Sequence, residues 1–138
     1  PAPESVTFPT LLDFPAPKVR SYPIYTVVAE KIEAVTKLKE TNSRMKDFYD
    51  LWFLFHRFEF DPITLRRAIG ATFERRKTPL PVMPEPFTDE LANEPMKQTQ
   101  WAGFLRRNSL TGVPGKFQEV VMDLRKLTAE TLGSETSS

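Results

Sequence analysis

Two charged residues, Lys31 and Asp47, occupy positions at which helical periodicity places apolar side chains. At about 100° per residue, Lys31 projects between Val27 and Val35, and Asp47 projects beside Leu54. Charged groups are rarely buried unless they are paired or take part in function. Lys31 and Asp47 are therefore the first candidates for chemistry in this sequence.

Each of the two residues has more than one interpretation. Lys31 can extend its ammonium past the apolar face into solvent, or it can hold an anion such as a phosphate in a cleft. Asp47 can simply favour the first turn of its helix, or pair with Lys31 in a buried salt bridge. A third interpretation makes Asp47 a metal ligand or a proton acceptor at a nucleotide site.

The residues around Asp47 extend this candidate site. Arg44 lies on the same helical face and has the forked guanidinium that clamps phosphate. Asp50 is predicted to project outward with Lys46, its partner four residues earlier. The two aspartates are therefore expected to differ, with Asp47 facing inward and Asp50 facing solvent.

The other polar candidates favour structural interpretations. His56 is a lone histidine on a helix flank, and a packed or hydrogen-bonded core role is the more common one for it. The basic clusters at residues 66–67 and 75–77 are typical of solvated faces, and nucleic-acid contact is the alternative. We find no glycine-rich phosphate loop, nucleophile elbow or zinc-protease motif in the sequence.

The elements that position these residues are mainly α-helical. We expect an extended, proline-rich arm over residues 1–23, a helical domain of about five helices over residues 24–132, and a disordered tail over residues 133–138. The expected helices cover residues 24–39, 43–58, 62–77, 95–108 and 114–132, with a short helical turn at 88–92. Asn42 or Ser43 is expected to cap the second helix, and Asp61 the third.

Composition excludes several classes of protein. The chain has 138 residues, no cysteine and one histidine, so disulfides are absent and a zinc cluster is nearly excluded. A net charge of +1 provides no global field for nucleic acid. No apolar run approaches the roughly 20 residues of a membrane span, and the first residues lack the pattern of a signal peptide. We expect a cytoplasmic protein without membrane contact.

Two motifs give the chain a resemblance to a known family. The segments AEKIEA at residues 29–34 and NSRMKDFYDL at residues 42–51 resemble the AbiEii/AbiGii-type toxins, which are nucleotidyltransferase-like proteins of abortive-infection and toxin–antitoxin systems. The segments FPTLLD at residues 8–13 and TPLP at residues 78–81 are also similar. The resemblance extends over roughly residues 8 to 130, and the second motif is its most specific part.

The resemblance implies roles for individual residues. The family builds its site from four motifs, of which the third supplies a lysine and the fourth an aspartate. Here these correspond to Lys31 and Asp47, which the resemblance makes catalytic, with Ser43, Arg44 and Lys46 as nucleotide-binding candidates.

The first two family motifs, a Gly-Ser and paired carboxylates, have no counterpart before Lys31, and the one Gly-Ser in the chain is at residues 133–134. We therefore expect the C-terminal part of an α+β nucleotidyltransferase-like protein, inactive by itself.

These implications set two expectations for function. The first is a toxin that transfers a nucleotide from an NTP to an acceptor such as RNA, with Mg²⁺ as the cofactor of the intact enzyme. The second is a helical module without chemistry, which binds a cognate antitoxin or an RNA. We also expect Lys31 and Asp47 to meet near one groove on adjacent antiparallel helices. Apolar surface beside that groove is expected to drive homodimerisation or aggregation.

Overall fold

Helices dominate the computed structural model, which describes residues 17–18, 21–37, 44–81 and 87–132. Within these residues the helices are α2 (Tyr22–Lys37), α3 (Met45–Arg57), α4 (Pro62–Arg75), α5 (Asp89–Ala92), α6 (Pro95–Arg107) and α7 (Phe117–Leu132). This architecture confirms the predicted mainly α fold. Most of the expected arm and all of the expected tail lie outside the described residues.

The helix ends follow local sequence signals. The Asp61 carboxylate accepts a hydrogen bond from the Thr64 backbone N–H at 2.9 Å, and Pro62 occupies the first turn of α4, as predicted. Thr88 caps α5 in the same way. The expected caps of α3, at residues 42–43, lie outside the described residues. Arg44 is the residue at the N-cap of α3, and its side chain makes no capping hydrogen bond.

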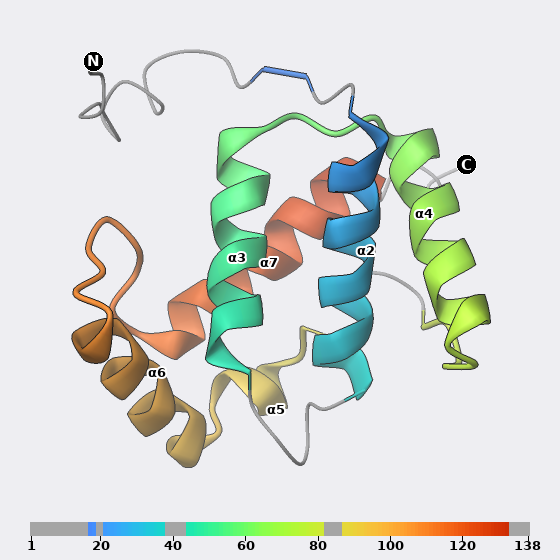
Figure 1. The fold of residues 1–138 in the computed structure, drawn as a ribbon. Helices are drawn as coiled ribbons and strands as arrows, with labels where there is room; N and C mark the ends of the chain where they lie inside the picture. Colours follow the sequence, from blue (N-terminus) through green and yellow to red (C-terminus); the bar gives the residue numbers. More distant parts are fainter. Residues whose placement is uncertain (1–16, 19–20, 38–43, 82–86, 133–138) are drawn as a thin grey trace.

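The helices are arranged around α2, α3 and α7 (Figure 1). Helices α2 and α3 lie side by side, α4 packs on the other flank of α2, and α7 crosses behind both. Helices α5 and α6 pack against α7, and α6 also contacts α3. Residues 17–18 of the expected arm contact this framework, because the Glu59 N–H donates to the Pro17 carbonyl at 2.8 Å.

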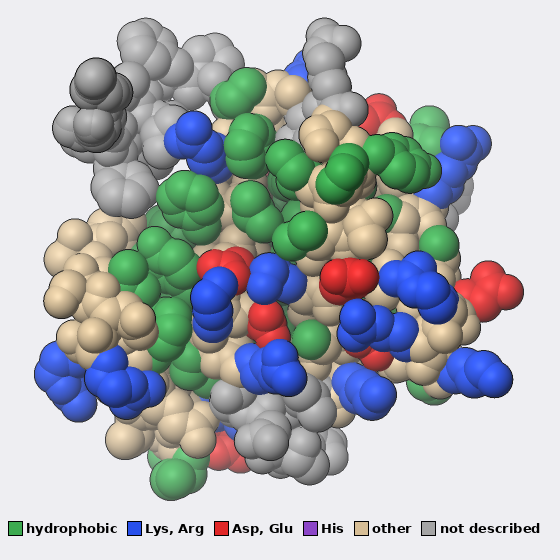
Figure 2. Space-filling model, in the orientation of Figure 1, with side chains coloured by type: hydrophobic (Ala, Val, Ile, Leu, Met, Phe, Trp, Pro, Cys, Tyr) green, Lys and Arg blue, Asp and Glu red, His purple; other side chains and the backbone are tan. Residues whose placement is uncertain are grey.

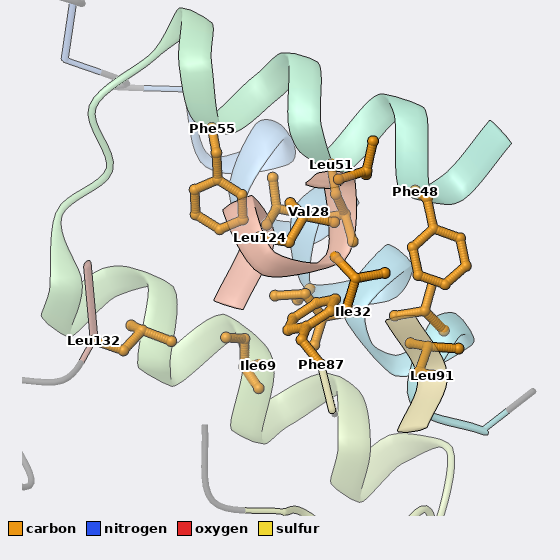
Figure 3. Close-up of a cluster of buried hydrophobic side chains, with 14 of the residues drawn as sticks. Val28, Ile32, Phe48, Leu51, Phe55, Ile69, Phe87, Leu91, Leu124 and Leu132 are labelled. Carbon is orange, nitrogen blue, oxygen red and sulfur yellow. The ribbon is translucent and has the colours of Figure 1, made fainter. Parts of the chain in front are cut away.

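The core lies between these helices. Phe48, Leu51 and Phe55 point from α3 into the core, which Leu124 of α7 also enters (Figure 3). Val28 and Ile32 of α2 and Phe87 fill the same space, and the aromatic rings of Phe48 and Phe117 meet edge to face at 5.0 Å. Helix α3 therefore lies at the centre of this packing.

In helical projection Glu33 lies opposite the apolar arc of α2, where an amphipathic helix faces solvent. Glu33 is 1% exposed. Its carboxylate accepts hydrogen bonds from Arg76 Nη1 at 3.1 Å and from Thr78 Oγ1 at 2.6 Å. The reason is that α2 is covered on two sides, by α3 and by α4, whereas an amphipathic pattern assumes one buried face.

Among the described helices, none combines the length and the apolar character that crossing a membrane requires.

Candidate functional site

Lys31 and Asp47 meet across the contact between α2 and α3, as predicted. The Lys31 Nζ donates to Asp47 Oδ1 at 3.1 Å, although the residues are 16 positions apart in the chain. Lys31 lies in the middle of α2 and Asp47 in the first turn of α3, so the two helices hold these side chains on facing surfaces. The geometry agrees with two interpretations of Asp47: it lies in the first turn of its helix, and it forms a part-buried salt bridge with Lys31.

Asp50 also belongs to this cluster, which corrects the expectation that it faces solvent away from Lys31. Its Oδ2 lies 3.0 Å from Lys31 Nζ and 2.8 Å from Lys46 Nζ. Residues three apart on a helix are neighbours on its surface, so a lysine opposite them can reach both carboxylates. The predicted pairing of Lys46 with Asp50 is confirmed.

The free oxygen of Asp47 is the unusual feature of the cluster. Asp47 is 7% exposed, and its Oδ2 is buried without a hydrogen-bond partner among the described residues. A buried carboxylate oxygen without a partner costs about 1–3 kcal/mol or more. Native proteins rarely keep such an atom unless a ligand or water binds it or it has a function.

The environment keeps Lys31 charged. Burial lowers the pKa of the Lys31 ammonium, but hydrogen bonds to Asp50 and Asp47, together with their charges, outweigh that effect, so the pKa is raised above its ordinary value of 10.5. A lysine ammonium has three N–H donors. Two carboxylate contacts leave one donor for another acceptor, and a phosphate oxygen is an acceptor of suitable charge.

The surface around the cluster is a belt of both charge signs. Figure 2 shows Lys, Arg, Asp and Glu side chains alternating across the face formed by α2 and α3, with hydrophobic side chains gathered beside them. Arg75 and Arg76 at the end of α4 pair with Glu30, and Arg76 also pairs with Glu33. Two side chains of the basic cluster at residues 75–77, those of Arg75 and Arg76, therefore form ion pairs with α2.

The other predicted nucleotide-binding residues are less closely connected. Lys46 reaches the cluster through Asp50 and is itself 74% exposed along its side chain. Arg44 is exposed directly before α3 and makes no ion pair with the part of the chain that the structure describes. Ser43 lies outside that part. The structure therefore brings together Lys31, Asp47 and Lys46 and leaves Arg44 unattached.

His56 belongs to a separate cluster on the other side of α3. Its Nε2 and the Trp52 Nε1–H both lie 2.7 Å from Asp123 Oδ2 of α7. The two rings also pack together, with centroids 4.3 Å apart. This arrangement confirms the prediction that His56 is a packed, hydrogen-bonded residue, and Asp123 is a partner that no local pattern indicated.

The described residues contain no group of three or more His, Cys, Asp or Glu side chains placed to hold a metal ion. Asp47 and Asp50 are the carboxylates nearest one another at the site, and both bind the Lys31 ammonium. That donor set does not fit a Mg²⁺ ion, which prefers several oxygen ligands in octahedral geometry.

Comparison with known proteins identifies one family. The chain matches a family model described as "Nucleotidyl transferase AbiEii toxin, Type IV TA system" over residues 1–122. No match was found among curated proteins or among solved structures.

Proposed function

The chain belongs to the AbiEii family of nucleotidyl transferase toxins of type IV toxin–antitoxin systems, and from that premise we propose that Lys31 and Asp47 serve in nucleotide transfer. In this proposal the Lys31 ammonium holds the triphosphate of an NTP. Asp47 orients Lys31 through Oδ1 and offers Oδ2 to a donor group of the substrate. The acceptor of the nucleotide is an RNA.

One observation supports this proposal most directly: in the part-buried Lys31–Asp47 pair, the Asp47 Oδ2 atom is buried and has no hydrogen-bond partner among the described residues. A purely structural salt bridge is expected to satisfy its buried atoms, because a half-satisfied buried pair is costly. A site that is completed by a polar ligand explains why this oxygen lacks a partner.

The Mg²⁺ that nucleotide transfer calls for by family resemblance would need ligands other than these residues. Asp47 and Asp50 are occupied by Lys31, so we assign this chain's contribution to holding and orienting the nucleotide. Ser43, Arg44 and Lys46 are proposed to add phosphate contacts at the start of α3.

Transfer measured in the natural protein tests the proposal. The variants Lys31→Ala and Asp47→Ala should each lose transfer of label from radioactive NTPs to total cellular RNA, by about 100-fold or more, together with toxicity on expression. Lys126→Ala, an exposed lysine on α7, is the matched control and should keep both activities. Full activity in both site variants would overturn the assignment.

Toxins of this family are paired with an antitoxin, and the alternative function is a binding module without chemistry. Binding of RNA that weakens steeply with salt would support the RNA form of that alternative. Binding of the antitoxin protein that does not depend on salt would support the protein form. In either case nucleotide transfer would be undetectable in the wild type as well as in Lys31→Ala.

We also propose that residues 1–138, isolated, form a homodimer through the apolar surface beside the Lys31 cluster. Val27, one helical turn before Lys31, is 40% exposed, and Tyr22 on the same helix is 64% exposed. Sedimentation should give a dimer, which Val27→Glu should convert to monomer. A monomer at all concentrations would reject the proposal.

A further inference from the structure

Asp50 has an unusual position in the charge cluster. Its Oδ2 accepts from two ammonium groups at once, Lys31 at 3.0 Å and Lys46 at 2.8 Å. Lys31 in turn bridges Asp50 and Asp47. The four side chains therefore form an alternating row across α2 and α3, with Asp50 as the only member that touches both lysines.

We infer that Asp50 is a positioning residue for the proposed nucleotide transfer, which fixes the Lys31 ammonium between two carboxylates so that its third N–H faces the substrate phosphate. The bond from the Lys31 side chain to Nζ and the two carboxylate contacts together fix the orientation of the tetrahedral ammonium, whereas one carboxylate contact constrains it less. This inference rests on the proposed role of Lys31.

A role in stability explains Asp50 less well. Its side chain is 21% exposed, and Lys46, the closer of its partners, is 74% exposed. The exposed pair with Lys46 contributes about 0–1 kcal/mol, so a larger role of Asp50 must act through its 3.0 Å contact with Lys31, in which both side chains are 21% exposed. Direct contact with the nucleotide is also unfavourable, since a carboxylate repels a triphosphate. Action through Lys31 is the remaining role that the geometry supports.

The inference predicts a specific kinetic signature for Asp50→Asn in the natural protein. Misorientation of the phosphate-holding group should lower kcat by about tenfold. KM for the NTP should stay equal or fall, because removing a negative charge beside Lys31 makes the site more attractive to phosphate. Lys31→Met should instead raise KM and lower kcat together, since it removes the phosphate contact itself.

Two further variants separate positioning from a general loss of structure. Asp50→Glu restores the carboxylate and should recover part of kcat. Asp89→Asn is the matched control, because it breaks an ion pair of similar length, 2.9 Å to Arg125, that is remote from Lys31. Asp89→Asn should leave both kcat and KM unchanged.

A readout independent of activity is the ammonium resonance of Lys31 in protein labelled with ¹⁵N-lysine. Held by two carboxylates, this ammonium should exchange its protons slowly enough to be observed, and in Asp50→Asn its signal should broaden or disappear. An unchanged Lys31 signal with unchanged kcat would overturn the inference.

The same set of variants shows which idea has failed. If Lys31→Met keeps full transfer activity, the proposed function itself is wrong. If Lys31→Met is impaired while Asp50→Asn behaves as wild type in kcat, KM and the Lys31 signal, only the positioning role of Asp50 is wrong.

Discussion

Arg76 reaches from the end of α4 to the buried carboxylate of Glu33 on α2, with 3.1 Å between Nη1 and Oε1. Glu33 lies two residues after Lys31, and two residues correspond to about 200° around a helix. Lys31 and Glu33 therefore face different neighbouring helices: Lys31 contacts α3, and Glu33 contacts the end of α4. These contacts fix the rotation of α2 about its axis, and that rotation aims Lys31 at Asp47.

We predict that Glu33→Gln destabilises the protein by about 1–3 kcal/mol, because the change weakens a buried, charge-assisted contact and places an amide N–H₂ beside the guanidinium of Arg76. The midpoint of urea denaturation measures the effect. Glu30→Gln is the control on the same helix: Glu30 is 39% exposed along its side chain and its removal should change stability by less than about 1 kcal/mol. Equal effects for the two variants would contradict the prediction.

A second prediction concerns alkaline pH. The pKa of Lys31 is raised in the folded protein, because its hydrogen bonds to Asp50 and Asp47 outweigh the cost of burial. Its contribution to stability is therefore fully present below the ordinary value of 10.5 and is lost as the pH rises through the higher folded-state value. The difference in unfolding free energy between wild type and Lys31→Met should therefore shrink as the pH rises above 10.5.

The comparison with Lys31→Met is needed because Tyr49 titrates in the same region. Burial and then the nearby charge of Asp50 raise the pKa of the Tyr49 phenol above its ordinary value of 10.0. This group also loses a stabilising contribution as pH rises, but it does so in wild type and variant alike. If the difference in unfolding free energy between wild type and Lys31→Met stays constant from pH 7 to pH 11, then Lys31 does not cause the loss of stability at alkaline pH.

The features predicted well from sequence depend on neighbours along the chain. Asp61 and the proline after it mark the start of α4. Such signals involve residues within about one or two helical turns, so a projection around one helix recovers them. The meeting of Lys31 with Asp47 was predictable for a related reason, since consecutive helices usually pack together.

The features that sequence analysis missed depend on contacts between different helices. Glu33 is buried because α4 covers the second flank of α2. Asp50 joins Lys31 because the two helices approach closely enough for one lysine to reach two carboxylates. Asp123 pairs with His56 across 67 positions of the chain. Periodicity within one helix contains no information about any of these contacts.

A third prediction concerns acid pH and the start of α4. Hydrogen bonds from the Thr64 backbone N–H and hydroxyl lower the pKa of the Asp61 carboxyl below its ordinary value of 3.8. Its contribution to stability is present above that value and is lost as pH falls through the lower folded-state value. Asp61→Ala should therefore lower Tm at pH 7, and the gap in Tm to wild type should narrow as the pH falls below the ordinary value of 3.8. A gap independent of pH would contradict the capping role.

The last prediction concerns the contact between α3 and α7. Asp123 Oδ2 accepts from both Trp52 Nε1 and His56 Nε2, each at 2.7 Å. Asp123→Ala leaves two ring nitrogens without their acceptor, and these rings are only partly exposed, so we expect a loss of about 1–3 kcal/mol in urea denaturation. Tryptophan fluorescence should shift to longer wavelength as water reaches the indole of Trp52.

Trp101 does not obscure that shift, because it is fully buried and donates to the Pro114 carbonyl at 2.9 Å, a contact that Asp123→Ala leaves in place. Asp89→Ala provides the matched control, since its carboxylate is 78% exposed in an ion pair with Arg125. That control should cost less than about 1 kcal/mol and leave the fluorescence unchanged. If Asp123→Ala behaves like the control in both measurements, then Asp123 does not join α3 to α7.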